Sequence, residues 1–211
     1  MTMYLSGASN PHLQEIAKIT PNLGIMLNPE SRYQPQIVRD YSQFAIDNGC
    51  FSQGDAFKLD SWLRYIDVFG EMSHKCLFVV APDRFDPCGM WQGITIASAT
   101  LERSIPVFSQ IRQRGFKAAL VAQNGLEDLD IPWNEFDVLF IGGDTTWKLS
   151  PMAVQIVRAA KSRGKWVHMG RVNSQKRFTT AENMGCDSVD GTYIKYGPNK
   201  NTENIIKWIR G

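Results

Sequence analysis

Three aspartates in this chain lie at or near the ends of short apolar runs. Asp47 closes "FAID", Asp83 closes "CLFVVAPD", and Asp190 lies within "DSVDGTYI". Carboxylates can do two kinds of chemistry at a sugar carbon, because one can attack the carbon covalently while another transfers a proton. A simpler interpretation exists for each, since Asp, Asn and Gly are frequent turn residues. Asp47, followed by Asn48 and Gly49, could cap a turn.

Eight short apolar runs alternate with helix-like segments along the chain. Most are rich in β-branched or aromatic residues and end at Gly, Asn, Asp or Pro, which is typical of strands. The runs are "MYLSGA", "LGIMLNP", "FAIDNG", "CLFVVAPD", "KAALVAQNG", "DVLFIGGD", "KWVHMGR" and "DSVDGTYI". Strands that alternate with helices favour a parallel sheet, and eight such units in 211 residues fit a compact α/β barrel of the (β/α)8 TIM type. An open doubly wound sheet is the alternative. We expect one domain over residues 1–211.

The segments between the runs carry helix signals. Residues 59–72 place Leu59, Trp62, Leu63, Ile66 and Phe69 on one apolar stripe. Pro106 interrupts the helical pattern of residues 99–115, which predicts a kink or a break. Further helices are predicted over 150–164, with a Ser–Pro start, and within 179–185 and 201–211.

In a barrel of this kind, the chemistry collects at the carboxyl ends of the strands. This rim combines carboxylates, an amide and a Gly–Gly pair, where backbone and ligand can approach closely. The sequence therefore predicts a polar active site there. The residues at the predicted strand ends are Ser6, Asn28, Asp47, Asp83, Gln123, Gly142, Gly143, Asp144, Arg171, Asn173 and Asp190.

Six motifs between residues 47 and 194 resemble, in the same order, those of the tRNA-guanine transglycosylase (queuine/archaeosine tRNA-ribosyltransferase) superfamily. The chain is most similar to the small phage-type enzymes that place 7-deazaguanines in DNA. "AIDNGCFSQG" resembles the family's aspartate-serine-glycine-glycine-phenylalanine turn, although Asn48, Cys50 and an inserted Ser52 depart from it. "VVAPDRFDP" resembles the strand with the base-recognising aspartate, and "LVAQNG" resembles valine-glutamine-glycine-glycine. "FIGGD", "VHMGRVNS" and "MGCDSVDGTYI" resemble the remaining three motifs.

The resemblance implies a pentosyltransferase that replaces guanine in a nucleic acid with a 7-deazaguanine, such as 7-cyano-7-deazaguanine. It places the covalent nucleophile on Asp190 and the general acid/base on Asp47. Asp83 would accept hydrogen bonds from the guanine N1–H and amine, while Gln123 and the amide of Gly143 would donate to O6. Gly142 would also bind the base, and the side chain of Phe51 or Met169 would stack on the flipped base.

The aspartate assignments have competitors. Asp187 competes with Asp190, but side chains alternate faces along a strand, so only one of them can face the interior. Asp190 could instead pair with Lys195 at the surface. Asp86 competes in the same way with Asp83, which could simply turn the chain.

Other candidates also have structural interpretations. Gly142 and Gly143 could form only a tight turn after a strand. Phe51 and Met169 could belong to the core. His168 lies on an alternating strand and is predicted to be a satisfied wall residue rather than a catalyst.

Basic residues follow the last two predicted strands, where barrels often bind phosphate. A single lysine is usually a solvated surface charge, but a set near the rim favours a phosphate-bearing substrate. The expected partners are DNA, with tRNA as the alternative, and a free 7-deazaguanine base. The basic residues are Arg171, Lys176, Arg177, Lys195 and Lys200.

No metal or other cofactor is predicted. The cysteines at positions 50, 76, 88 and 186 include no C-x-x-C pair, and we expect Cys76 and Cys186 in the core. The tRNA enzymes of the superfamily carry a zinc site after the last strand. The corresponding "KYGPNKNTENIIKWIRG" has no Cys or His, which predicts no zinc subdomain and favours DNA.

Bulk properties restrict the class of protein less. The net charge of +2 neither requires nor excludes a polyanionic partner. The sequence contains no apparent signal peptide or membrane span, so we expect a cytoplasmic protein, in the host cytoplasm if it is phage-encoded.

Two other functions fit the same residues. An N-glycosidase would let water resolve the intermediate, and it would release free guanine without an incoming base. A non-catalytic nucleic-acid-binding protein would use the aspartates only as turn residues, so Asp190→Asn would change no activity.

Overall fold

The computed structural model describes residues 2–31, 35–84 and 94–210. Within them, eight parallel strands pair in sequence order and close into a barrel, because the first strand also pairs with the last. The predicted (β/α)8 barrel is confirmed, and all eight predicted runs contain a strand. The strands are β1 (Met3–Ser6), β2 (Leu23–Leu27), β3 (Phe44–Ile46), β4 (Cys76–Val80), β5 (Ala118–Ala122), β6 (Val138–Ile141), β7 (Trp166–Met169) and β8 (Ser188–Gly191).

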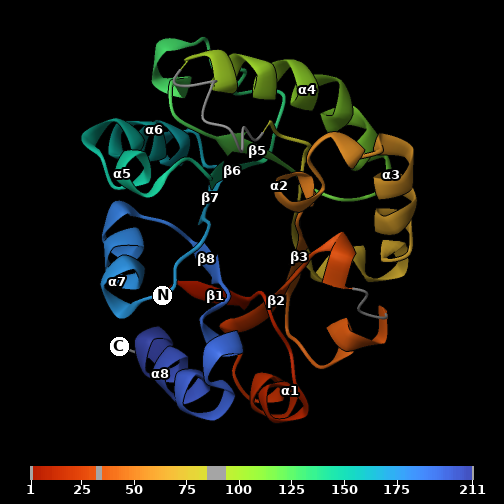
Figure 1. Ribbon diagram of the computed structural model, residues 1–211, viewed down its shortest axis with the longest axis vertical. Helices are drawn as coiled ribbons and strands as arrows, with labels where there is room; N and C mark the ends of the chain where they lie inside the picture. Colours follow the sequence, from red (N-terminus) through yellow and green to blue (C-terminus); the bar gives the residue numbers. More distant parts are fainter. Residues whose placement is uncertain (1, 32–34, 85–93, 211) are drawn as a thin grey trace.

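Helices surround the barrel strands in Figure 1. The α-helices are α1 (Pro11–Lys18), α2 (Cys50–Gln53), α3 (Leu59–Asp67), α4 (Ile94–Gln113), α5 (Thr145–Lys148), α6 (Pro151–Ser162), α7 (Gln175–Met184) and α8 (Pro198–Arg210). Short 3-10 turns are η1 (Pro29–Ser31), η2 (Pro35–Arg39), η3 (Gly54–Ala56), η4 (Gly70–Lys75), η5 (Leu126–Asp128) and η6 (Tyr193–Tyr196). No helix in the described part of the chain has the length and apolar character needed to cross a membrane.

The helix start signals work through hydrogen bonds within the first turn of each helix. The Ser150 side chain accepts the N–H of Ala153, and Pro151 occupies the first turn of α6. Helix α1 was not predicted, although it uses the same device: Asn10 accepts the N–H of Leu13, and Pro11 follows. These caps satisfy backbone donors that have no partner within the helix.

A kink or a break was predicted at Pro106, and the break does not occur, because α4 is one helix from Ile94 to Gln113. A proline inside a helix leaves the carbonyl four residues earlier without its hydrogen bond. That residue is Glu102, and both Pro106 and Glu102 are exposed. Water can therefore satisfy the freed carbonyl, and the helix continues.

Alternating strand residues form two layers of side chains. One set points outward and packs under the helices, and the other fills the barrel. The inner apolar set consists of Met3, Leu5, Met26, Ala45, Phe78, Val80, Ala119, Val121 and Val138. On β7 and β8 the inner layer turns polar, with a fully buried His168 and Ser188.

Candidate active site at the carboxyl end of the barrel

Two predicted aspartates and the predicted glutamine meet in one hydrogen-bonded group after β3, β4 and β5. The backbone N–H of Asn48 donates to Asp47 Oδ1 at 2.9 Å, and its side-chain amide donates to Asp83 Oδ1 at 3.1 Å. Gln123 Nε2 donates to the other oxygen of Asp83 at 2.8 Å. Asn28, after β2, donates to Asp47 Oδ2 at 3.1 Å. We call these five residues the acid–amide cluster.

The environment of the cluster raises the pKa of both aspartates. Burial raises the pKa of Asp47 to about 7, and the charges of Asp83 and Asp190 add to this effect. Burial raises the pKa of Asp83 to about 6, against the opposing effect of hydrogen bonds such as that from Asn48. Asp47 is therefore present in both protonation states near neutral pH, as a general acid/base requires.

The turn after β3 does not depend on Asp47 as a helix cap. Asn48 Oδ1 accepts the N–H of Cys50 at 2.7 Å. Gly49 has a φ of 75°, a left-handed conformation that glycine adopts readily, and it precedes α2. Asn48 and Gly49 thus form the turn, and the carboxylate of Asp47 is left to the cluster.

Asp190 faces the barrel interior from β8. Its Oδ1 lies 2.9 Å from Nε2 of His168, and its side chain is 17% exposed. The surface ion pair with Lys195 is not found among the described residues. His168 is the buried wall residue that the sequence predicts, but its hydrogen bond with Asp190 was not predicted. The available signal was register, since His168 pairs with Ser188, two residues before Asp190.

Asp187 lies at the opposite, amino end of β8. Its carboxylate accepts two hydrogen bonds of 2.7 Å from Lys161 and one of 2.8 Å from the N–H of Val167. Strand alternation allows only one of Asp187 and Asp190 to face the interior; this is confirmed, and Asp190 is the residue that does so. Asp86, the competitor of Asp83, lies outside the described residues.

Lys148 is a buried cation that the sequence patterns did not identify. It is 1% exposed, and its ammonium donates to the carbonyl of Gly170 at 2.6 Å. Burial lowers the pKa of Lys148 to about 8; the charge of Arg171 lowers it further, while that of Asp190 opposes the shift. These interactions place the lysine within electrostatic reach of Asp190. No sequence pattern marks it, because it lies on the single-turn helix α5.

The Gly142–Gly143 turn is tightly packed, and its amides are already in use. Both N–H groups donate to the carbonyl of Ala122, at 2.9 and 3.2 Å. A side chain on Gly142 would come within 2.6 Å of Val121, and one on Gly143 would collide with Trp147. The expected free amide of Gly143 is therefore corrected: in this structure the group is bonded within the protein.

The two candidates for a stacking shelf differ in position. Met169 is 1% exposed and belongs to the layer under the helices, on the opposite face of β7 from His168. The expectation that Met169 stacks on a base is therefore wrong for this structure, because the strand points it away from the interior. Phe51, on α2, is 62% exposed near the acid–amide cluster.

The predicted basic residues follow β7 and β8 as expected. Arg171 donates to the carbonyls of Gly142 and Gly143, and Arg177 donates to the carbonyl of Arg171 at 3.4 Å. Arg171 thus supports the β6 turn as well as adding charge. Lys176, Lys195 and Lys200 are exposed, on the first turns of α7 and α8 and on η6.

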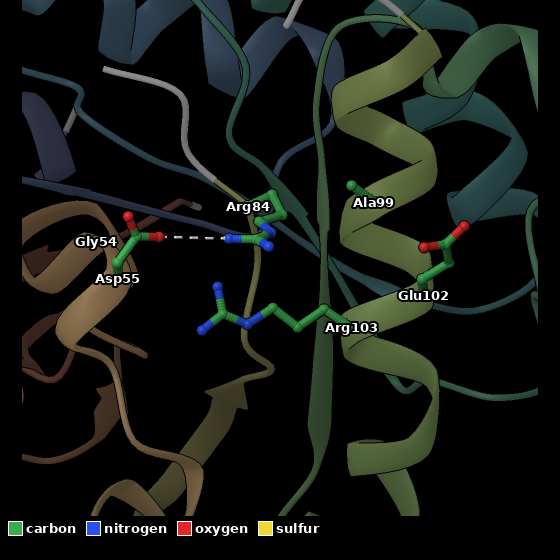
Figure 2. Close-up of a pocket in the computed structure, with 6 residues that line it drawn as sticks. All are labelled: Gly54, Asp55, Arg84, Ala99, Glu102 and Arg103. Atoms are coloured by element: carbon green, nitrogen blue, oxygen red, sulfur yellow. Dashed lines mark ion pairs between the residues drawn. The ribbon is translucent and has the colours of Figure 1, made fainter. Parts of the chain in front are cut away.

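A cavity of about 540 Å³ opens beside the acid–amide cluster, between η3 and α4. Arg84 and Arg103 extend into it in Figure 2, and Arg84 lies 3.8 Å from Asp55. Arg103 also donates to the backbone carbonyl of Asp83 at 2.9 Å, so this wall supports the cluster. No predicted site residue lines the cavity, and its charges balance. The lining consists of Gly54, Asp55, Arg84, Ala99, Glu102 and Arg103.

The described residues contain no group of three or more Cys, His, Asp or Glu side chains that could hold a metal ion. Cys50 and Cys186 are buried, whereas Cys76 is only partly buried, and Cys88 lies outside the described residues. No protein-family model matches the chain, and no curated protein matches it.

Proposed function

We propose that this protein is a base-exchange transglycosylase that replaces guanine in DNA with a 7-deazaguanine through a covalent aspartyl–C1′ intermediate. One observation carries the proposal: Asp47, Asp83 and Asp190 occupy one end of the barrel, and their surroundings differ. Asp47 has a raised pKa, whereas Asp190 is hydrogen-bonded to a histidine near a buried lysine. Two carboxylates with separate roles are what a glycosidic exchange requires.

In the first half of the reaction, an oxygen of Asp190 bonds to C1′ while the bond from C1′ to N9 of guanine breaks. The electron pair of that bond leaves with the base, and protonated Asp47 supplies a proton to it. In the second half, Asp47 takes a proton from the incoming base, whose N9 attacks C1′. Asp190 then departs as a carboxylate, so the enzyme returns to its starting state.

Asp83 is suited to recognise guanine. Asn48 donates to one of its oxygens and Gln123 to the other, and because a carboxylate oxygen can accept more than one hydrogen bond, the pair can also accept from the guanine N1–H and amine. Asn48 and Gln123 fix the orientation of the carboxylate. Exposed Phe51 is the aromatic candidate for stacking on the extruded base.

A nucleic acid is the favoured substrate because cations gather where the last two strands end. Lys176, Arg177, Lys195 and Lys200 follow β7 and β8, and these are the loops at which barrels commonly bind phosphate. DNA is proposed ahead of tRNA because the motifs most resemble those of the small phage-type enzymes that act on DNA.

The test is to incubate the protein with duplex DNA or with tRNA, each with labelled guanine. Label in DNA supports the proposal, and label in tRNA alone would assign the tRNA activity. Free guanine released without any incoming base would identify an N-glycosidase. Binding without exchange or release, unchanged in Asp190→Asn, would identify a non-catalytic protein.

A further inference from the structure

A chain of four polar side chains runs through the barrel interior on β7 and β8. Trp166 Nε1 lies 2.9 Å from Ser188 Oγ, and Ser188 Oγ lies 2.8 Å from His168 Nδ1. His168 Nε2 in turn lies 2.9 Å from Asp190 Oδ1. We call these four residues the polar column. Ser188 and His168 are completely buried, so the column exchanges no partner with solvent at its centre.

The chemistry of the groups gives the column a direction. The indole of Trp166 can only donate, so Ser188 Oγ accepts from it. If His168 also donated to Ser188, the serine hydroxyl would need another acceptor, and the described residues offer none. Ser188 therefore donates to Nδ1 of His168. The remaining proton of the neutral imidazole is then on Nε2, which donates to Asp190.

Aromatic packing holds the imidazole in place. The ring centroid of His168 lies 5.0 Å from that of Phe78 and 4.7 Å from that of Phe140. The ring cannot turn between these neighbours without disturbing a closely packed interior. Among the described residues, Asp190 Oδ2 accepts no hydrogen bond. One carboxylate oxygen is thus fixed, and the other is left for the reaction.

We propose that His168 is a positioning residue for the nucleophile: it donates from Nε2 to Asp190 Oδ1 and aims Oδ2 at C1′, while Trp166 and Ser188 select this tautomer. The inference rests on the proposed function. The column is not a proton route, because it ends at an indole N–H that neither accepts a proton nor releases one under ordinary conditions. His168 therefore acts through the geometry of Asp190.

The kinetic test compares three variants with the wild-type chain in single-turnover formation of the DNA adduct. In His168→Gln, a side-chain amide can replace the Nε2 donor, whereas His168→Asn reaches only toward Ser188 and His168→Phe preserves only the packing. We expect His168→Gln to retain most of the rate. The other two variants should lose on the order of 10²-fold, a cost typical of misplaced reacting groups. DNA affinity should stay constant in all of them.

A spectroscopic test does not depend on activity. The protonated nitrogen of His168 can be identified by ¹H–¹⁵N NMR at neutral pH, with the signal assigned by its loss in His168→Gln. We expect a proton on Nε2 alone, and a growing Nδ1–H population in Ser188→Ala, which removes the selecting donor.

The outcomes separate the inference from the proposed function. The positioning role alone is overturned if the wild type exchanges bases and His168→Phe still forms the adduct at the full rate. It is also overturned if the proton of wild-type His168 is found on Nδ1. If the wild-type protein forms no adduct and exchanges no base, the proposed function is refuted. The positioning role then fails with it, even if the proton of His168 is found on Nε2.

Discussion

The acid–amide cluster and the polar column place the same type of side chain in two different settings. In the cluster, two partly buried aspartates share amide donors, and Arg103 donates to the backbone carbonyl of Asp83. In the column, one aspartate has a histidine donor, and Lys148 lies within electrostatic reach. The first setting raises the pKa of Asp47 to about 7, which suits proton transfer. The second keeps a carboxylate aimed and supported, which suits attack on carbon.

The comparison shows that the surrounding groups, and not the residue type, set the pKa and the orientation of each carboxylate. Asn48 links Asp47 to Asp83, so any change in the cluster should alter proton handling at both sites. Among the residues that the structure describes, no hydrogen bond joins the column to the cluster, although the charge of Asp190 contributes to the raised pKa of Asp47. Substitutions in the two regions should therefore have separable effects.

The largest expected effect comes from Asp190→Asn. A neutral amide is a poor nucleophile, so both the covalent adduct and base exchange should be lost, on the order of 10³-fold or more. Mass spectrometry of trapped, protease-digested adduct should locate the label on Asp190 in the wild type. A label on Asp187 would show that the wrong aspartate has been assigned. DNA affinity of the variant controls for misfolding.

Asp47→Asn should have the next largest effect, a loss of roughly 10²–10⁴-fold in the rate of base exchange. The proposed mechanism needs the protonated form of Asp47 when guanine leaves, so wild-type adduct formation should fall as pH rises through about 7. The variant lacks this titrating carboxyl, so the fall in rate centred near pH 7 should be absent from its profile. A wild-type profile that is flat around neutral pH would contradict the assigned role.

A smaller effect is expected from Lys176→Gln combined with Lys200→Gln. For duplex DNA, each lost lysine–phosphate ion pair should reduce the slope of log affinity against log salt by roughly 0.9, and the two together by roughly 1.8. The chemical step, measured at saturating DNA, should be unchanged. Lys18→Gln is the matched control, because Lys18 lies in the last turn of α1 beside Glu15. An equal change in both proteins would show that the rim has no special role.

The smallest effect on activity is expected from Asp187→Asn. This carboxylate joins Lys161 to the N–H of Val167, so the substitution should cost about 0.5–1.5 kcal/mol in the free energy of unfolding. The rate of exchange should not change. Denaturant unfolding and the DNA exchange assay measure the two quantities. If Asp187→Asn lost base exchange while its free energy of unfolding stayed unchanged, Asp187 would take part in the reaction. The assignment of Asp190 as the reacting aspartate would then be contradicted.

Much of the architecture could be predicted from local sequence patterns. The alternation of apolar runs with amphipathic segments predicted the barrel, because strand and helix periodicity depend on neighbours along the chain. Face alternation, which is also a local property, predicted that Asp187 and Asp190 lie on different faces, and the motif resemblance singled out Asp190 as the interior one. The sequence could not decide whether Pro106 breaks the helix, since that depended on whether water could reach the freed carbonyl of Glu102.

What only the tertiary structure decided is which groups meet. His168 donates to Asp190 because β7 and β8 are in register, and Lys148 is buried because α5 lies against the end of β7. Strand geometry turns Met169 toward the helices, and a hydrogen bond to Ala122 occupies the amide of Gly143. The sequence determined the strands and the polar residues at their ends. Closure of the barrel decided which of these polar side chains are buried, which groups they bond and which charges lie near them. These properties depend on distances between segments that are remote in the chain.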